Sequence, residues 1–154
     1  MAMLLVLLTM IWTMPALAWN EPTGFQDFPW GTSERTVKSR VEMIYCLEDP
    51  TANRGYRTCK GPFNFGSVRT EAYFKFRRGG LVTVDLRFDE NDFEVIKSML
   101  LDQYGGASLE QPASLYWKGR ITSIILARGK NRQQTAMAAF TEAKEEEAIL
   151  EPSR

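Results

Sequence analysis

Residues 68–88 alternate between apolar and polar side chains with a period of two, and this pattern constrains the fold more than any other part of the chain. The segment reads VRTEAYFKFRRGGLVTVDLRF, with Arg-Arg-Gly-Gly between its two halves. Strict alternation is typical of a strand with one buried and one solvated face, and a Gly-containing break joins two such strands into a hairpin. The sequence therefore predicts a β-hairpin. Asp85 lies on its solvated face, where we expect an ion pair with Lys75 or Arg87 rather than a catalytic role.

Two segments have the period of an amphipathic helix. The first begins at a cap, Thr32 or Ser33, and is expected to end near Tyr45. The second begins at a capping-box pattern that opens with Asn91, and Gly105 is expected to stop it. Their apolar stripes recur at helical spacing and comprise Val37, Val41 and Ile44 in the first helix and Phe93, Ile96, Leu100 and Tyr104 in the second.

The remaining pattern predicts a second hairpin over residues 114–127, with a turn at Lys118-Gly119. Residues 133–150 fit either a short strand followed by a helix or one continuous helix, since Ala, Glu and Lys favour helix; we favour the strand and helix. Sequential hairpins imply an antiparallel sheet. The sequence therefore predicts an α+β fold, with a sheet of about five to six strands and two helices packed on one face.

The first eighteen residues predict a signal peptide rather than a structural element. MLLVLLTMIW is an apolar core of about ten residues, which is shorter than the roughly twenty that a membrane span requires. Ala16-Leu17-Ala18 places small residues where signal peptidase cleaves. We therefore expect cleavage after Ala18, export to the periplasm or the medium, and no transmembrane span afterwards. The expected organisation is a signal peptide at 1–18, one α+β domain at 19–142, and an acidic tail or short helix at 143–154.

Cys46 and Cys59 are the two cysteines of the chain. In an exported protein an isolated pair is most simply a disulfide, and the spacing is far wider than that of a redox-active C-x-x-C. The bond would close the polar, Pro- and Gly-containing segment LEDPTANRGYRT, which we expect to be a loop.

The chain has no histidine, which excludes Ser-His-Asp and Cys-His catalysis and imidazole-bound zinc. It also lacks a P-loop and a dinucleotide fingerprint, and positive and negative residues balance at 19 each, so we expect no nucleic-acid binding. We predict no cofactor and no metal. The acidic cluster at residues 89–94 could bind Ca²⁺, but it lacks EF-hand spacing and fits the start of a helix better. Acid–base chemistry by carboxylates stays open.

Basic residues gather around the second predicted hairpin, with no acidic residue from 117 to 132. This predicted basic rim could receive an anionic protein or the head group of an envelope lipid, beside an aromatic anchor. Against this, the glutamates of residues 141–151 could neutralise the cations, and a strand tryptophan is more often a core residue. The candidate binding residues are Trp117, Lys118, Arg120, Arg128, Lys130 and Arg132.

Residues 24–40, GFQDFPWGTSERTVKSR, combine an aromatic strand, a glycine and a helix start. A helix N-terminus can hold an anion. Here, however, Thr32 or Ser33 already satisfies a backbone N–H, and Glu34 would repel an anion. The segment is therefore interpreted as a structural corner, in which Gly31 makes the turn.

The segments FQDFPWGTSERTV, YFKFRRGGLVTVDLRF, FEVIKSMLLDQYG and YWKGRITSIIL together resemble functionally uncharacterised small exported bacterial α+β domains. The resemblance covers about residues 24–128 and implies a fold layout without catalytic residues. The layout is also similar to the periplasmic domains of outer-membrane assembly lipoproteins, although this chain lacks their lipidated cysteine. We therefore expect a non-enzymatic binding or accessory protein of the bacterial envelope. The alternatives are a carboxylate- or metal-dependent hydrolase and an envelope structural protein without a discrete ligand.

Overall fold

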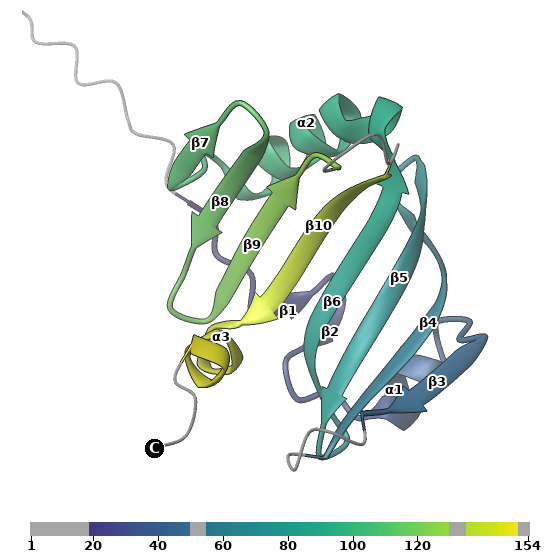
Figure 1. Ribbon diagram of the computed structural model, residues 1–154. Helices are drawn as coiled ribbons and strands as arrows, with labels where there is room; N and C mark the ends of the chain where they lie inside the picture. Colours follow the sequence, from purple (N-terminus) through teal and green to yellow (C-terminus); the bar gives the residue numbers. More distant parts are fainter. Residues whose placement is uncertain (1–18, 50–54, 130–134, 151–154) are drawn as a thin grey trace, which may run out of the picture.

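The computed structural model describes residues 19–49, 55–129 and 135–150. Within these ranges two antiparallel four-stranded meanders join edge to edge into one eight-stranded sheet (Figure 1). The strand order is β3-β4-β5-β6-β10-β9-β8-β7, so β6 and β10 form the seam between the meanders. One meander follows helix α1 and the other follows helix α2, so the chain comprises two helix-plus-four-strand units in tandem.

In each half of the described chain, a helix is followed by four strands of the main sheet. In chain order, the elements of the described residues are β1 (Gly24–Phe25), β2 (Phe28–Pro29), α1 (Glu34–Lys38), β3 (Tyr45–Glu48), β4 (Tyr56–Phe65), β5 (Val68–Arg77), β6 (Gly80–Asp89), the 3₁₀ turn η1 (Glu90–Asp92), α2 (Phe93–Tyr104), β7 (Leu109–Gln111), β8 (Ser114–Lys118), β9 (Thr122–Ala127), β10 (Thr135–Glu142) and α3 (Ala143–Leu150).

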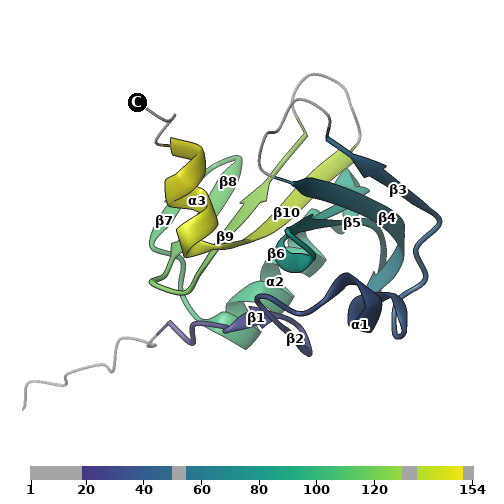
Figure 2. The same cartoon turned by 90° about the horizontal axis from the view of Figure 1, so that it is seen from below.

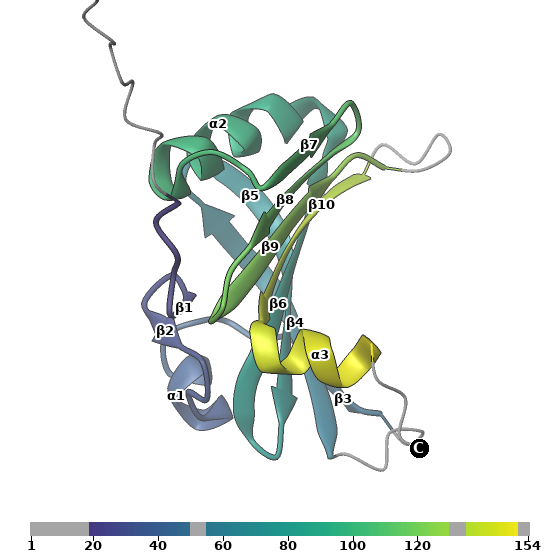
Figure 3. The ribbon, with the colours of Figure 1, turned by 90° about the vertical axis from the view of Figure 1, so that its left-hand side faces the viewer.

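The two faces of the sheet are covered unequally. Figure 3 shows α1, α2 and the small β1–β2 hairpin on one face, which we call the inner face, while α3 stands on the opposite, outer face. Figure 2 shows the same separation from below. Within the described part of the chain, α3 is the only element on the outer face, and it lies near the end of β10.

The core lies between the inner face and its cover, and aromatic rings dominate it. Phe25 of β1 is fully buried, with its ring centroid 5.0 Å from that of Phe140 on β10 and 6.1 Å from that of Phe74 on β5. The rings of Phe63 and Phe65 on β4 lie 5.3 and 6.4 Å from the same centroid. One side chain from the N-terminal hairpin therefore packs against strands of both meanders.

The α+β class and the antiparallel sheet are confirmed, but the prediction of five to six strands and two helices is wrong. The described residues contain eight strands in the main sheet and three α-helices. The difference arises mainly at residues 45–65, where β3 and β4 form. Residues 47–58 were interpreted as a loop between the cysteines, and no element was predicted for residues 59–65. Gly61 and Pro62 hide the strand pattern of β4, and its full-length pairing with β5 overrides their poor strand propensity.

The first helix is much shorter than expected. It covers Glu34–Lys38, and Ser33 caps it by accepting a hydrogen bond from the backbone N–H of Thr36. Val37 and Val41 are buried as predicted, but Ile44 is exposed, because its backbone N–H donates to Lys60 of β4 and the chain there is already extended.

The apolar stripe and the end of the second helix agree with their predictions, as do the C-terminal strand and helix. The stripe of α2 is buried, and Gly105 ends the helix with a positive φ of 85°. The capping box at Asn91 is wrong: Asp89 accepts from the N–H of Asn91 and caps the preceding 3₁₀ turn instead. Residues 135–150 form a strand and then a helix. The predicted signal peptide at 1–18 and the last four residues of the tail lie outside the described residues.

Gly31 makes the predicted corner between β2 and α1. It has a φ of +82°, a conformation that side chains with a Cβ rarely adopt, and its N–H donates to the carbonyl of Leu81 at 2.8 Å. The neighbouring Trp30 donates from Nε1 to Thr122 Oγ1 at 2.7 Å, which ties the corner to β9.

The predicted disulfide between Cys46 and Cys59 is present, and it joins two residues directly opposite each other in β3 and β4. We expect reduction to lower the free energy of unfolding by about 3 kcal/mol, because the oxidised bond restricts a 13-residue segment of the unfolded chain. Urea unfolding with and without a reductant measures this. A Cys46→Ser/Cys59→Ser variant should be insensitive to the reductant, and an equally large effect in that variant would contradict the explanation.

Burial of Tyr104 against the core predicts a loss of stability in alkali. Desolvation raises the pKa of Tyr104 to about 12, well above the ordinary value for a tyrosine. The unfolded chain therefore releases this proton at lower pH than the folded chain does, so stability falls as the pH rises from 10 to 12. In thermal melts over that range, Tyr104→Phe should lose less stability than the parent. Parallel curves for the two proteins would disprove the assignment.

Candidate functional site

The structure separates the residues of the predicted basic rim. Trp117 is fully buried, and its Nε1 donates to the carbonyl of Gly105 at 2.8 Å, so it belongs to the core. Lys118 and Arg120 are exposed at the turn between β8 and β9. Arg128 follows the far end of β9, whose six residues span about 20 Å. Lys130 and Arg132 lie outside the described residues.

Arg128 is already neutralised by the acidic cluster that begins α2. Its Nη1 lies 2.6 Å from Glu90 Oε1, its Nη2 contacts Glu94, and its guanidinium lies 3.9 Å from the ring centroid of Phe93. The hydrogen bond from Arg128 and that from the N–H of Gly129 lower the pKa of Glu90. The acidic cluster therefore joins the start of α2 to the residue that follows β9.

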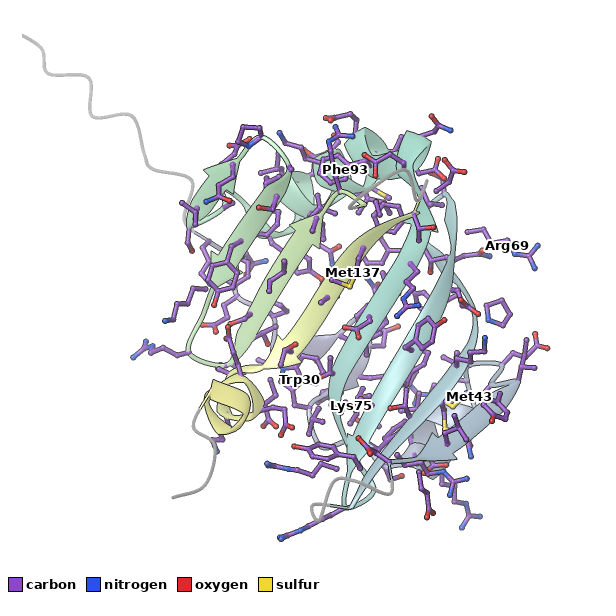
Figure 4. All side chains as sticks on the ribbon, in the orientation of Figure 1. Trp30, Met43, Arg69, Lys75, Phe93 and Met137 are labelled. Carbon is purple, nitrogen blue, oxygen red and sulfur yellow. A yellow bond between two sulfur atoms is a disulfide. The ribbon has the colours of Figure 1, made fainter. Side chains whose placement is uncertain are left out.

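The outer face carries a continuous row of side chains that crosses the sheet. The strand registers place one row of side chains across it, because each member lies directly opposite the next. From one edge region to the other, the row comprises Lys60, Tyr73, Asp85, Ala139, Ile125 and Tyr116. Lys75 and Met137 belong to the neighbouring rows, and Figure 4 shows both on the side facing the viewer.

The outer-face half formed by β4, β5 and β6 carries a connected group that we call the cation–tyrosine cluster. Three of its members share hydrogen bonds: Glu71 Oε1 accepts from Lys60 Nζ at 2.9 Å, and Oε2 accepts from the hydroxyl of Tyr73 at 2.7 Å. These bonds lower the pKa of Glu71. The cluster comprises Lys60, Glu71, Tyr73, Lys75, Asp85 and Arg87.

Two cations of the cluster lie over tyrosine rings. The guanidinium of Arg87 lies 4.4 Å from the ring centroid of Tyr73, and Lys75 Nζ lies 4.5 Å from that of Tyr56. Neither forms an ion pair with a described carboxylate within 4 Å. The ring of Tyr73 is partly exposed, whereas that of Tyr56 is buried. A ring carries no net charge, so a cation held over it keeps its positive charge and can still attract an anionic ligand.

Asp85 occupies the centre of the cluster, between these two cations along the strands. The sequence placed it correctly on the solvated face, but the expected ion pair is absent among the described residues. Burial raises the pKa of Asp85, and the more distant positive charges of Arg87 and Lys75 only partly oppose this. The small side chain of Ala139 lies opposite Asp85 on β10. The result is a poorly solvated carboxylate to which no described side chain donates a hydrogen bond.

Helix α3 closes one end of the outer face through two glutamates. The buried Glu145 accepts a hydrogen bond from the Tyr56 hydroxyl and lies 3.0 Å from Arg77 Nη1. Glu146 accepts from the hydroxyl of Tyr116 at 2.8 Å. Helix α3 therefore pairs with one outer-face cation, Arg77, and accepts hydrogen bonds from two tyrosines. Lys118 and Arg120 have no acidic partner among the described residues.

Two open hollows lie on the surface, and the first of them borders the cation–tyrosine cluster at Lys60 and Glu71. One, of about 470 Å³, lies beside β3 and has one carboxylate, Glu71. The other, of about 390 Å³, lies beside α2 and also has one, Asp102. Neither hollow has the paired carboxylates that a hydrolase would need.

Glu34, Cys46 and Cys59 place three candidate metal-ligand atoms within 4.8 Å of one another. Both sulfur atoms belong to the disulfide, however, and thiolates are the form in which cysteine binds metals. This group therefore does not form a metal site while the disulfide is intact.

No family model, curated protein or solved structure matches this chain. Among its described helices, none has both the length and the apolar character required to cross a membrane.

We predict that Asp85→Asn raises the free energy of unfolding at pH 7. The parent folds with an ionised carboxylate in a poorly solvated position, and its raised pKa means that folding becomes less favourable as the pH rises through that pKa. The amide avoids this penalty. Below pH 3, where the carboxyl is protonated in both states, the gain should disappear.

Chemical denaturation at pH 3 and pH 7 tests this prediction, with Asp102→Asn as the matched control at an exposed position. If Asp85→Asn instead destabilises the protein at pH 7, the Asp85 carboxylate makes stabilising interactions in the folded state. The interpretation of Asp85 as a poorly solvated carboxylate without a partner would then be wrong.

Proposed function

We propose that this protein is an exported, non-enzymatic binding module of the bacterial envelope that recognises an acidic partner protein through the cation–tyrosine cluster. One observation carries the proposal: Lys75 and Arg87 lie on the outer face, Lys75 beside the end that α3 covers and Arg87 in the exposed part, and both contact tyrosine rings instead of carboxylates. Cations held in this way are preorganised to meet anionic groups on a partner.

The distribution of charge favours a protein over a lipid surface. Glu71 and Asp85 lie among the cations of the cluster, so the surface alternates in sign over short distances. An anionic membrane presents one sign of charge and would be repelled by these acids. A protein partner can match both signs, and Asp85 could accept a hydrogen bond from one of its donors.

Export rests on the pattern of the first eighteen residues, with cleavage proposed after Ala18. The disulfide is compatible with an oxidising compartment. Poor solvation of Asp85 gives further support to a binding role, because interaction surfaces commonly retain groups that reduce stability.

Affinity capture from an envelope extract at low salt should recover acidic proteins with the parent. Capture with the Lys75→Gln/Arg87→Gln variant should recover about tenfold less of these proteins. The variant lacks both cluster cations that form no ion pair with a described carboxylate. The same binding should weaken between 50 and 300 mM salt. Quantitative mass spectrometry of the captured proteins measures both effects.

The matched control is Lys118→Gln/Arg120→Gln, which removes the same charge from the exposed part of the predicted basic rim. If the control variant loses capture while Lys75→Gln/Arg87→Gln retains it, the binding site is the predicted basic rim and not the cation–tyrosine cluster. Stronger binding to anionic lipid vesicles than to any protein would instead identify a lipid head group as the ligand.

A further inference from the structure

Helix α3 lies over polar side chains of the outer face. Tyr56 and Ser123 are 7% and 2% exposed there, and Thr83, which lies opposite Thr141 near the end of β10, is 9% exposed. Each of these buried side chains carries a hydroxyl group, which can donate a hydrogen bond to an anion. Four polar side chains of the sheet contact the first turn of α3. We call these four the α3 floor, and they are Tyr56, Arg77, Tyr116 and Ser123.

Two consecutive glutamates of α3 occupy this floor. Glu145 contacts it on β4 and β5, through a hydrogen bond from the Tyr56 hydroxyl and an ion pair with Arg77 at 3.0 Å. Glu146 contacts it on β8 and β9, where it accepts hydrogen bonds from both floor hydroxyls. The chain itself therefore shows the ligand chemistry that suits the floor: an acidic segment with two neighbouring carboxylates.

The contact between α3 and its floor gives the helix little net stabilisation. Glu145 is fully buried, and its Oε2 lies beside Arg77 without accepting a hydrogen bond from the described residues. Removal of a carboxylate and a guanidinium from water costs free energy that their mutual attraction offsets only in part. When α3 detaches, both groups are hydrated again, and the floor that it uncovers is polar. Detachment therefore costs far less than exposure of an apolar core.

The path of α3 also suits a helix that can detach. Figure 1 views α3 nearly along its axis, and Figure 3 shows it leading away from the sheet on the outer side. Its start is anchored, because the N–H of Ala143 donates to the carbonyl of Ile121 at 2.8 Å. Movement about the end of β10 would therefore lift Glu145 and Glu146 from the floor together while the helix stays attached to the sheet.

Lys75 joins the α3 floor to the cation–tyrosine cluster. Its Nζ lies 4.5 Å from the ring centroid of Tyr56, the same side chain whose hydroxyl binds Glu145. Arg77 lies two residues beyond Lys75 on the same face of β5. Once Glu145 leaves, Arg77 and Lys75 present two neighbouring cations along one strand. The floor is therefore continuous with the surface to which we assign the acidic partner.

We propose that α3 is an internal ligand of a binding site for adjacent carboxylates, and that an acidic segment of the partner protein displaces it. One carboxylate of that segment takes the place of Glu145 between Tyr56 and Arg77, and the next takes the place of Glu146. This inference deepens the proposed function and rests on it for the acidic character of the partner.

Fluorescence anisotropy on the purified full chain tests the proposal with a labelled synthetic peptide as the probe. The peptide has the sequence of residues 141–150, TEAKEEEAIL, and so carries both glutamates that occupy the floor. Glu145→Ala/Glu146→Ala frees the floor within the chain. This variant should bind the probe about tenfold more tightly than the parent, whose own helix competes at a high effective concentration.

Asp27→Ala/Asp102→Ala is the matched control and should bind the probe like the parent. It removes the same charge at two exposed positions, on elements that cover the inner face. Addition of Arg77→Gln to Glu145→Ala/Glu146→Ala should abolish the gain in affinity. A probe in which the same two glutamates are replaced by glutamine should also lose it, because the floor then meets no carboxylate at these positions.

Nuclear magnetic resonance of the isotope-labelled parent tests displacement directly. An excess of unlabelled probe should move the amide signals of residues 147–150 toward those of Glu145→Ala/Glu146→Ala. This readout uses the parent chain, so it decides the question even if that variant does not fold. Circular dichroism and a retained disulfide show whether each variant is folded.

Each other outcome overturns the inference. Equal binding of the probe by the parent and by Glu145→Ala/Glu146→Ala, or α3 signals that the probe leaves unchanged, would make α3 a fixed structural element. A parent dimer in sedimentation that this variant loses would assign the floor to α3 of a second copy. The peptide assay depends on Arg77, whereas capture from the envelope extract depends on Lys75 and Arg87. A failure of this inference is therefore distinguishable from a failure of the proposed function.

Discussion

The packing of Phe25 against aromatic rings from both meanders is the interaction on which the rest of the fold depends. The two helix-plus-four-strand units share one pair of hydrogen-bonded strands, β6 and β10. Phe25 lies across this seam on the inner face, in contact with Phe74 from one unit and Phe140 from the other. Aromatic contacts of this kind add to the free energy gained by burying the rings. They fix the units as one sheet.

This arrangement directs the polar chemistry of the chain to the outer face. Because α1, α2 and the β1–β2 hairpin all cover the inner face, the alternate side chains of every strand must face outward with one short helix above them. Glu145 bonds to the first unit through Tyr56, and Glu146 bonds to the second through Tyr116. Helix α3 therefore bridges the units from the outside at one end, and leaves Asp85 and its flanking cations uncovered.

The sequence predicted the elements whose own pattern decides their structure. Residues 68–88 alternate without interruption, and the stripe of α2 ends at a glycine, so local periodicity was sufficient. Strand β4 was missed because Gly61 and Pro62 obscure its pattern and pairing with β5 determines its structure. The first helix was predicted too long because the pairing of residue 44 with β4 ends it early.

The candidate site was predictable only in part, because charge balance depends on the folded arrangement. Arg128 has no acidic neighbour in the sequence, yet Glu90, 38 positions away, neutralises it. Asp85 was correctly placed on the solvated face, but its nearest cations contact tyrosines instead. The exposure of Ile44 could not be predicted. Its helical spacing from Val37 and Val41 indicated the buried face of a helix.

The two ends of the described chain lie on opposite sides of the sheet. Trp19, the first described residue, packs against Tyr104 of α2 with their ring centroids 6.1 Å apart, so the chain enters from behind the sheet. Helix α3 ends the described chain in front of it (Figure 1). Trp19 therefore lies on the covered side of the sheet, whereas Lys75, Asp85 and Arg87 lie on the opposite face. The start of the described chain does not obstruct a partner that approaches these three side chains.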